Sequence, residues 1–192
     1  MARTIEFDKN SALEKATGYF WSVGYEAASM RDLASAMQVN MGSLYNTFGG
    51  KDECFAAALE HYLKIYVEPT LAALSAADDP LAALKMHLQK IVDGCTTSAG
   101  AQGCFLLNTA LELSERQNAL AVAAHEYLAL FHKTLHVALQ SAHDKGQIRA
   151  NANIDEITNY LMGVMLTLRT FSRMKADQKM MADYLKTALS VL

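Results

Sequence analysis

The stretch SMRDLASAMQVNMGSLYNTFGGK, residues 29–51, predicts two short helices joined by a tight turn. Ser29 can cap the first helix, and Asp32 stands three residues later, in the reciprocal arrangement that satisfies free N–H groups at a helix start. Asn40 interrupts the helical pattern and can cap a second helix from Met41 to about Phe48. The stretch therefore has the pattern of a helix-turn-helix.

The second of these helices has one apolar side and one small, polar side. Leu44 and Phe48 are four residues apart, so both point inward. The outward side carries small and hydrogen-bonding residues: Gly42, Ser43, Tyr45, Asn46 and Thr47. A helix that reads DNA must lie close in the major groove and offer donors and acceptors to base edges and phosphates. The pattern therefore favours a DNA-reading helix.

The longer segment GYEAASMRDLASAMQVNMGSLYNTFGGKDECFAAAL, residues 24–59, resembles the DNA-binding segment of the tetracycline-repressor (TetR) family of bacterial regulators. The landmarks of that family are present as Gly24-Tyr25, Ser29, Leu33-Ala34, Gly42-Ser43-Leu44-Tyr45, Phe48 and Lys51-Asp52-Glu53. Asn46-Thr47 departs from the pattern, in which two bulky or aromatic residues are commoner. This departure bears on which operator sequence is recognised, and not on the mode of binding. The alternative is a three-helix module that binds protein instead of DNA.

The residues expected to contact double-stranded operator DNA lie in and around this segment. They are Arg3, Ser29, Arg31, Met41, Gly42, Ser43, Tyr45, Asn46, Thr47 and Lys51. The chain has a formal net charge of -3, and residues 1–51 hold five basic and five acidic side chains. Because a nucleic-acid binder usually presents a basic face, we expect modest affinity with a shallow salt dependence.

Composition predicts a protein of the cytoplasm. A chain of 192 residues suits one or two domains with a real core. The start of the chain is mixed and polar, unlike a secretory leader, and the apolar run at residues 161–168 is too short to cross a bilayer. Three cysteines without framework spacing fit a reducing compartment. We expect no membrane partner.

The rest of the chain predicts an all-α protein of about nine helices. We expect a helix-turn-helix DNA-binding domain at residues 1–50 and a ligand-binding and dimerisation domain at residues 51–192. The expected helices are Glu6–Val23, the pair described above, Lys51 to about Leu74 with a kink or early end at Pro69, Pro80 to about Thr97 capped by Asp79, Cys104–Leu113, Gln117 to about Lys145, a helix capped by Asn153 to about Met174, and a last helix capped by Asp177.

The end of the chain predicts a homodimer through the last two helices. One side of the helix before the last is strongly apolar: Ile157, Tyr160, Leu161, Val164, Met165, Leu168 and Phe171. Met162, Leu166 and Thr170 add a second surface, and a helix that is apolar on more than one face is buried on more than one side. Two such helices from each subunit can form a four-helix interface, as the resemblance implies, or an ordinary monomer core.

A ligand pocket is predicted in the body, where the segment GCFLLNTALEL resembles the pocket entrance of many TetR repressors. Its expected lining is Cys104, Phe105, Asn108, Tyr127, Phe131, Met162 and Met165, which suits a small, mostly apolar inducer. A position in the first turn of a helix, near its positive end, favours the thiolate form of Cys104. A thiol-based sensor of electrophiles or oxidants is therefore an alternative. Plain packing is the other reading of all seven residues.

No catalytic, nucleotide-binding or metal-binding motif appears, so we expect neither an enzyme nor a cofactor. His132 and His136 have metal-ligand spacing but lack nearby carboxylate or cysteine ligands on their stripe. The resemblance implies a transcriptional repressor that leaves its DNA when an inducer binds, because the bound inducer repositions the Lys51–Leu74 helix. A helical ligand-binding or adaptor protein without DNA binding is the alternative from another class.

Overall fold

The computed structural model describes residues 8–116 and 119–192, and every regular element in them is helical. The helices are α1 (Lys9–Val23), α2 (Met30–Met37), α3 (Met41–Phe48), α4 (Lys51–Tyr62), η1 (Leu63–Val67), α5 (Glu68–Ser75), α6 (Pro80–Gly94), η2 (Gly100–Gln102), α7 (Phe105–Glu112), α8 (Ala119–Asp144), α9 (Ile154–Arg173), α10 (Gln178–Ala188) and η3 (Leu189–Val191). Since α4, η1 and α5 follow one another without a break, the predicted all-α fold of about nine helices is confirmed. None of the helices in the described part of the chain could span a bilayer.

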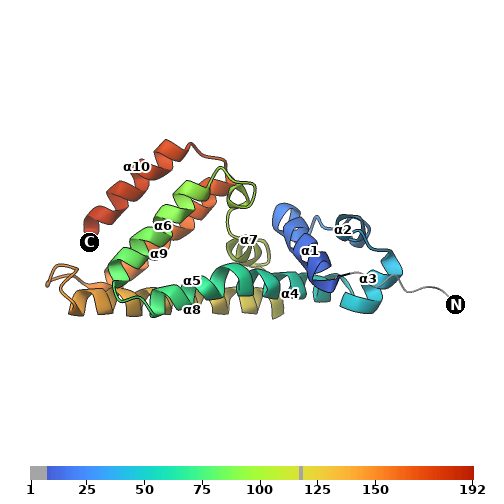
Figure 1. Cartoon of the computed structure of the whole chain (residues 1–192), viewed down its shortest axis with the longest axis horizontal. Helices are drawn as coiled ribbons and strands as arrows, with labels where there is room; N and C mark the ends of the chain where they lie inside the picture. Colours follow the sequence, from blue (N-terminus) through green and yellow to red (C-terminus); the bar gives the residue numbers. More distant parts are fainter. Residues whose placement is uncertain (1–7, 117–118) are drawn as a thin grey trace.

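The first three helices form a compact unit at one end of the molecule (Figure 1). Both predicted caps are present: the Ser29 side chain accepts from the Asp32 N–H at 3.1 Å, and Asn40 Oδ1 accepts from the Ser43 N–H at 2.8 Å. The core of this unit is built from large side chains that are nearly or fully buried: Phe20, Leu33 and Leu44 of the three helices, and Phe55 of the following helix α4. Burial of these side chains stabilises the packing of α1 to α4.

The last turn of α1 buries its indole side chain. Val23 is 39% exposed, whereas Trp21 is buried. The Trp21 ring packs edge-on against the Tyr62 ring with centroids 5.0 Å apart, and its Nε1 donates to the Gln102 carbonyl at 3.1 Å. The last turn of α1 therefore rotates its large indole toward α4 and the α6–α7 loop.

A continuous rod of α4, η1 and α5 joins this unit to the body (Figure 1). α4 packs along α1, and α5 packs on α6 and α8. The rod runs past Pro69 to Ser75, close to the predicted end at about Leu74, so of the two alternatives at Pro69 the early end does not occur. A π-turn over Leu63–Val67 stands shortly before the proline. Proline has no N–H and removes one helical hydrogen bond, and a π-turn is a common place for a local change of helical register.

The body is made from α6 to α10. α8 packs on α5, α6, α7 and α9, and α10 covers α6 and α9. α6 ends at Gly94 instead of Thr97, and Cys104 caps α7 instead of lying in its first turn. The predicted start of α8 at Gln117 lies outside the described residues.

The apolar stripe of α9 is used inside the protomer. Five of the seven side chains expected on the strongly apolar side are buried in the core: Ile157, Leu161, Val164, Met165 and Leu168. They face α6 and α8, against which α9 packs. These five residues therefore belong to the core of one protomer, the second of the two alternatives given for this stripe, because one chain already removes them from water.

Candidate nucleic-acid interface and ligand cavity

The outward face of α3 is open to solvent. Leu44 and Phe48 are buried, which turns the opposite side of the helix outward. Met41, Gly42, Asn46 and Thr47 are exposed, Ser43 is half-buried, and the Tyr45 side chain is 50% exposed. This surface therefore presents the Tyr45 ring with its hydroxyl, the Asn46 amide and the hydroxyls of Ser43 and Thr47. At Gly42 the backbone itself can be approached. Groups of this kind can reach base edges and phosphates in a major groove.

Other predicted contact residues surround α3 but are partly engaged within the chain. The Ser29 hydroxyl donates to Asp32 Oδ2 at 2.7 Å as part of the helix cap. The Lys51 Nζ donates to the Glu26 carbonyl at 3.2 Å and lies 4.6 Å from the centroid of the Tyr25 ring. Arg31 on α2 is exposed, whereas Arg3 lies outside the described residues.

A contact that the sequence did not indicate joins the unit of α1, α2 and α3 to the body. Glu112, the last residue of α7, accepts from the Tyr25 N–H at 2.9 Å and from the Glu26 N–H at 2.8 Å. Gly24 makes the approach possible, since its φ is +85° and a Cβ there would stand 2.7 Å from Glu112 Oε2. A salt bridge between Arg116 and Glu26 lies beside this contact.

A second contact comes from the end of α9. The Arg173 guanidinium donates to the carbonyls of Trp21 at 3.1 Å and Ser22 at 3.0 Å, at the end of α1. It also lies 3.4 Å from the Gln102 carbonyl, which accepts from Trp21 Nε1 as well. Arg173 and Glu112 therefore attach two helices of the body to the end of α1 and to the turn that follows it. Each is an ordinary charged residue near a helix end, and no local pattern distinguishes it.

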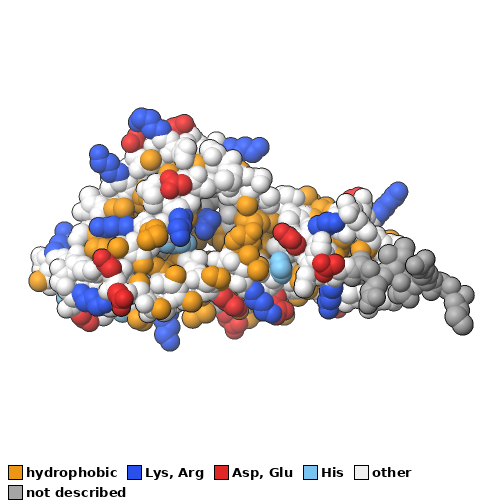
Figure 2. Space-filling model, in the orientation of Figure 1, with side chains coloured by type: hydrophobic (Ala, Val, Ile, Leu, Met, Phe, Trp, Pro, Cys, Tyr) orange, Lys and Arg blue, Asp and Glu red, His pale blue; other side chains and the backbone are white. Residues whose placement is uncertain are grey.

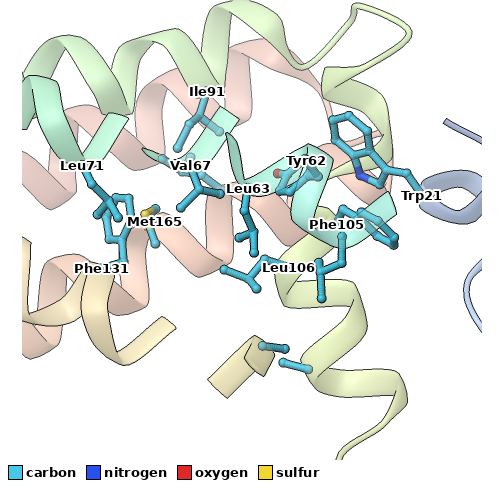
Figure 3. Packing of buried hydrophobic residues seen from close by; sticks show 14 of the residues in the cluster. Trp21, Tyr62, Leu63, Val67, Leu71, Ile91, Phe105, Leu106, Phe131 and Met165 are labelled. Carbon is cyan, nitrogen blue, oxygen red and sulfur yellow. The ribbon is translucent and has the colours of Figure 1, made fainter. Parts of the chain in front are cut away.

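A narrow apolar cavity of about 40 Å³ lies in the body between the rod, α7, α8 and α9. Of the predicted lining residues, Cys104, Phe131 and Met165 line it, and Figure 3 shows Phe131 and Met165 beside Val67 of the rod. Its remaining lining residues are Tyr62, Tyr66, Thr70, His87, Leu106, Leu128, Leu166 and Arg169.

The structure does not bring the other four predicted residues to this cavity. Phe105 is buried among aromatic rings, with its centroid 5.2 Å from Phe55 and 5.6 Å from Tyr62, and lies at a separate surface hollow. Asn108 lies at the same hollow and donates to the Gln102 carbonyl at 3.1 Å. Residues 105 and 108 lie on the same side of α7, and this side faces away from the cavity.

Tyr127 and Met162 also do not line the cavity, although both are partly buried and pack against the hydrophobic core. Each lies about one helical turn N-terminal to a residue that does line it, Phe131 on α8 and Met165 on α9. Compared with this cavity, the predicted pocket lining lies on the same helices but extends about one turn further along α8 and α9.

Several polar side chains line the cavity, among them Tyr62, Cys104, His87 and Arg169. The Tyr62 hydroxyl donates to Cys104 Sγ at 3.5 Å, and burial raises the pKa of Tyr62 well above its usual value. The His87 Nε2 is buried and has no hydrogen-bond partner among the described residues. Burial, with Arg169 and Lys90 nearby, lowers the pKa of His87 to about 4, so the ring is neutral at pH 7. Nothing local in the sequence marked His87 or Arg169.

The histidine row on α8 has structural partners. His132 Nε2 lies 2.8 Å from Asn159 Oδ1, and His136 Nε2 lies 3.0 Å from Asp155 Oδ1. No group of three or more potential metal ligands occurs in residues 8–116 and 119–192. The row therefore connects α8 to the start of α9.

A helix-turn-helix with an open second helix, joined to a helical body by a continuous helix, is the architecture of a transcriptional regulator. Two family models match the chain: "Bacterial regulatory proteins, tetR family" over residues 12–58, and "Tetracyclin repressor-like, C-terminal domain" over residues 80–188. The chain belongs to the TetR family of bacterial transcriptional regulators, which confirms the resemblance seen in its sequence. The members of this family are regulators and not enzymes.

Individual relatives agree with this assignment. The chain is 28% identical over 193 residues to the uncharacterized regulator YezE of Bacillus subtilis, covering 100% of both chains. It is 26% identical over 184 residues to the repressor ComR of Escherichia coli, covering 95% of this chain and 88% of ComR. Among solved structures, a cysteine mutant of the TetR regulator CifR complexed with a 26-bp operator superimposes with a TM-score of 0.80 at 25% identity, covering 98% of both chains.

Proposed function

We propose that this protein is a repressor that binds a palindromic operator as a homodimer and is released by a small, mostly apolar inducer. The observation that carries the proposal is the open face of α3, with Tyr45 half exposed above the buried Leu44. The similar CifR structure contains operator DNA, and the relative ComR is named a repressor, which supports the same role here.

A surface on α8 supports the homodimer. Val122, Leu130 and Val137 are 52%, 45% and 56% exposed, and their spacing of eight and seven residues puts them on one side of the helix. Tyr160 on the neighbouring α9 is 43% exposed. We therefore place the interface on α8 and α9 instead of on the last two helices. Two α3 helices related by a twofold axis would require an operator with two symmetric half-sites.

The contacts between body and reader suggest how release occurs. Tyr62, Tyr66 and Val67 of the rod line the cavity, and the same rod begins at Lys51 beside α3. On α9, Arg169 lines the cavity one turn before Arg173, which holds the end of α1. A ligand that favours a different rod or α9 position would shift both α3 helices out of register with successive major grooves.

Retardation of the protein's own upstream DNA tests the proposal. Tyr45→Ala should weaken retardation about tenfold or more, since a lost base or phosphate contact costs roughly 1–3 kcal/mol per half-site. Met86→Ala is the matched control, because Met86 is 55% exposed on α6, away from the reader. Absence of retardation would favour the adaptor alternative, and equal retardation by both variants would contradict the role of α3.

A thiol-based sensor is a second candidate, favoured by the place of Cys104. Its sulfur is half-buried at the cavity and accepts from the Tyr62 hydroxyl and, at 3.5 Å, from the Leu107 N–H. Modification of this sulfur would break both contacts at the start of α7. Treatment with iodoacetamide should then release DNA from the wild type but not from Cys104→Ser. Release that is equal in the two proteins would exclude Cys104 as the sensor.

A further inference from the structure

A second hollow, of about 210 Å³, adjoins the apolar cavity and shares five lining residues with it. The shared residues are Tyr62, Tyr66, Thr70, His87 and Arg169. The outer hollow adds Lys90 and Ile91 of α6 and reaches the loop before α7. The two spaces therefore form one cleft with an apolar inner end and a polar mouth.

The mouth of this cleft is positively charged although the chain as a whole is negative, with a formal net charge of -3. Lys90 and Arg169 both line it, and no Asp or Glu occurs among the described residues that line either space. Neither cation has an ion pair or a side-chain hydrogen bond with another described residue. Figure 2 shows Lys and Arg side chains beside hydrophobic ones over the region between α6 and α5.

A partly buried arginine without a carboxylate partner is uncommon, because removing its charge from water costs free energy that a partner normally offsets. His87 adds a buried Nε2 without a hydrogen-bond partner at the same place. Since the mouth supplies positive charge and hydrogen-bonding capacity but no negative charge, it is suited to an anion. Arginine in particular holds a carboxylate through two parallel hydrogen bonds.

The inner end is suited to an apolar group. Its side chains are aliphatic, aromatic or thioether: Val67, Leu106, Leu128, Phe131, Met165 and Leu166. The volumes of about 40 and 210 Å³ are each below the roughly 300–1,000 Å³ of sites for drug-sized ligands. The occupant must therefore be small, and the flexible Met165 can shift to admit it.

We propose that this cleft binds a small amphipathic carboxylic acid, with its carboxylate at Arg169 and His87 and its apolar tail among Phe131, Met165 and Val67. The proposal builds on the proposed function by naming the chemical class of the inducer. Such an acid differs from a purely apolar inducer, because its negative charge supplies part of the binding affinity and all of the discrimination against neutral and cationic analogues.

Binding of three matched probes to the DNA-free protein tests this proposal: 4-phenylbutyrate, 4-phenyl-1-butanol and 4-phenylbutylammonium, measured by calorimetry. We expect the acid to bind about tenfold more tightly than the alcohol and the ammonium to bind most weakly. Arg169→Gln should weaken the acid about tenfold and leave the alcohol unchanged, whereas Arg169→Lys should keep part of the preference. Lys85→Gln removes a charge from the same helix as Lys90 without touching the cleft, so it should change neither affinity.

Equal affinities for acid and alcohol, no binding of the acid at millimolar concentration, or an acid affinity untouched by Arg169→Gln would each overturn the proposal. Melting curves of the ligand-free variants verify that they fold. Because these measurements contain no DNA, they are independent of operator binding: a protein that binds the acid but fails to retard DNA would refute the proposed function and leave the anion site standing.

Discussion

Replacement of Glu112 should loosen the DNA-reading unit from the body. The Glu112 carboxylate accepts two backbone N–H groups, from Tyr25 at 2.9 Å and Glu26 at 2.8 Å. Hydrogen bonds to charged groups contribute roughly 1.5–3 kcal/mol each, and because Glu112 is exposed to solvent we place these two lower, at about 1–1.5 kcal/mol each. Glu112→Ala should therefore lower the free energy of unfolding by about 2–3 kcal/mol.

Thermal unfolding followed by circular dichroism measures this effect. For a chain of this size, the expected loss corresponds to a fall in melting temperature of about 4–12 °C. Glu112→Gln retains one acceptor oxygen and should lose roughly half as much. Glu115→Ala is the control, since Glu115 is exposed and has no hydrogen bond or ion pair with another described residue. If Glu112→Ala and Glu115→Ala melt at the same temperature, the Glu112 contact does not hold the two parts together.

Three further outcomes follow from the same geometry. Gly24→Ala should lower the free energy of unfolding by about 2 kcal/mol or more, because Gly24 has a positive φ and a Cβ there would collide with Glu112. In a protein that also carries Glu112→Ala, only the backbone cost of about 1–2 kcal/mol should remain, which denaturant unfolding would measure. The pKa of His87 is about 4 in the folded protein and about 6.5 in the unfolded chain, so the free energy of unfolding falls as the pH falls from 6.5 to 4. This fall should be absent in His87→Gln, so the unfolding free energies of the two proteins should diverge by up to about 3 kcal/mol between pH 7 and pH 4. Parallel pH profiles of the two proteins would contradict this. Leu130→Arg with Val137→Arg should convert a dimer to a monomer in analytical ultracentrifugation with its helicity unchanged, whereas an unchanged sedimentation coefficient would move the interface elsewhere.

The elements that the sequence predicted well are those specified by neighbouring residues. The Ser29 and Asn40 caps act over two or three residues, so their chemistry could be read directly from the chain. The exposure of Tyr45 follows from the i, i+4 spacing of Leu44 and Phe48 on the other side of α3. All-helical class, helix order and the reading helix are consequences of such local patterns.

The parts that could not be predicted depend on contacts between distant residues. Glu112 meets the turn at Tyr25 across 87 positions, and Arg173 meets Trp21 across 152. His87 and Arg169 share a cleft only because α6 and α9 pack together. Periodicity also predicted that the stripe through Leu161 and Leu168 is buried, but it could not say whether the covering surface belongs to the same chain.

Footprinting on the upstream DNA tests the central claim, that two α3 helices read one operator across a twofold axis. Hydroxyl-radical cleavage should show two protected tracts, symmetric about a dyad and about one helical turn (roughly 10 bp) apart or a multiple of it. Tyr45→Ala should abolish both tracts at a concentration where the wild type protects them. One unsymmetric tract, or protection that survives Tyr45→Ala unchanged, would contradict the account.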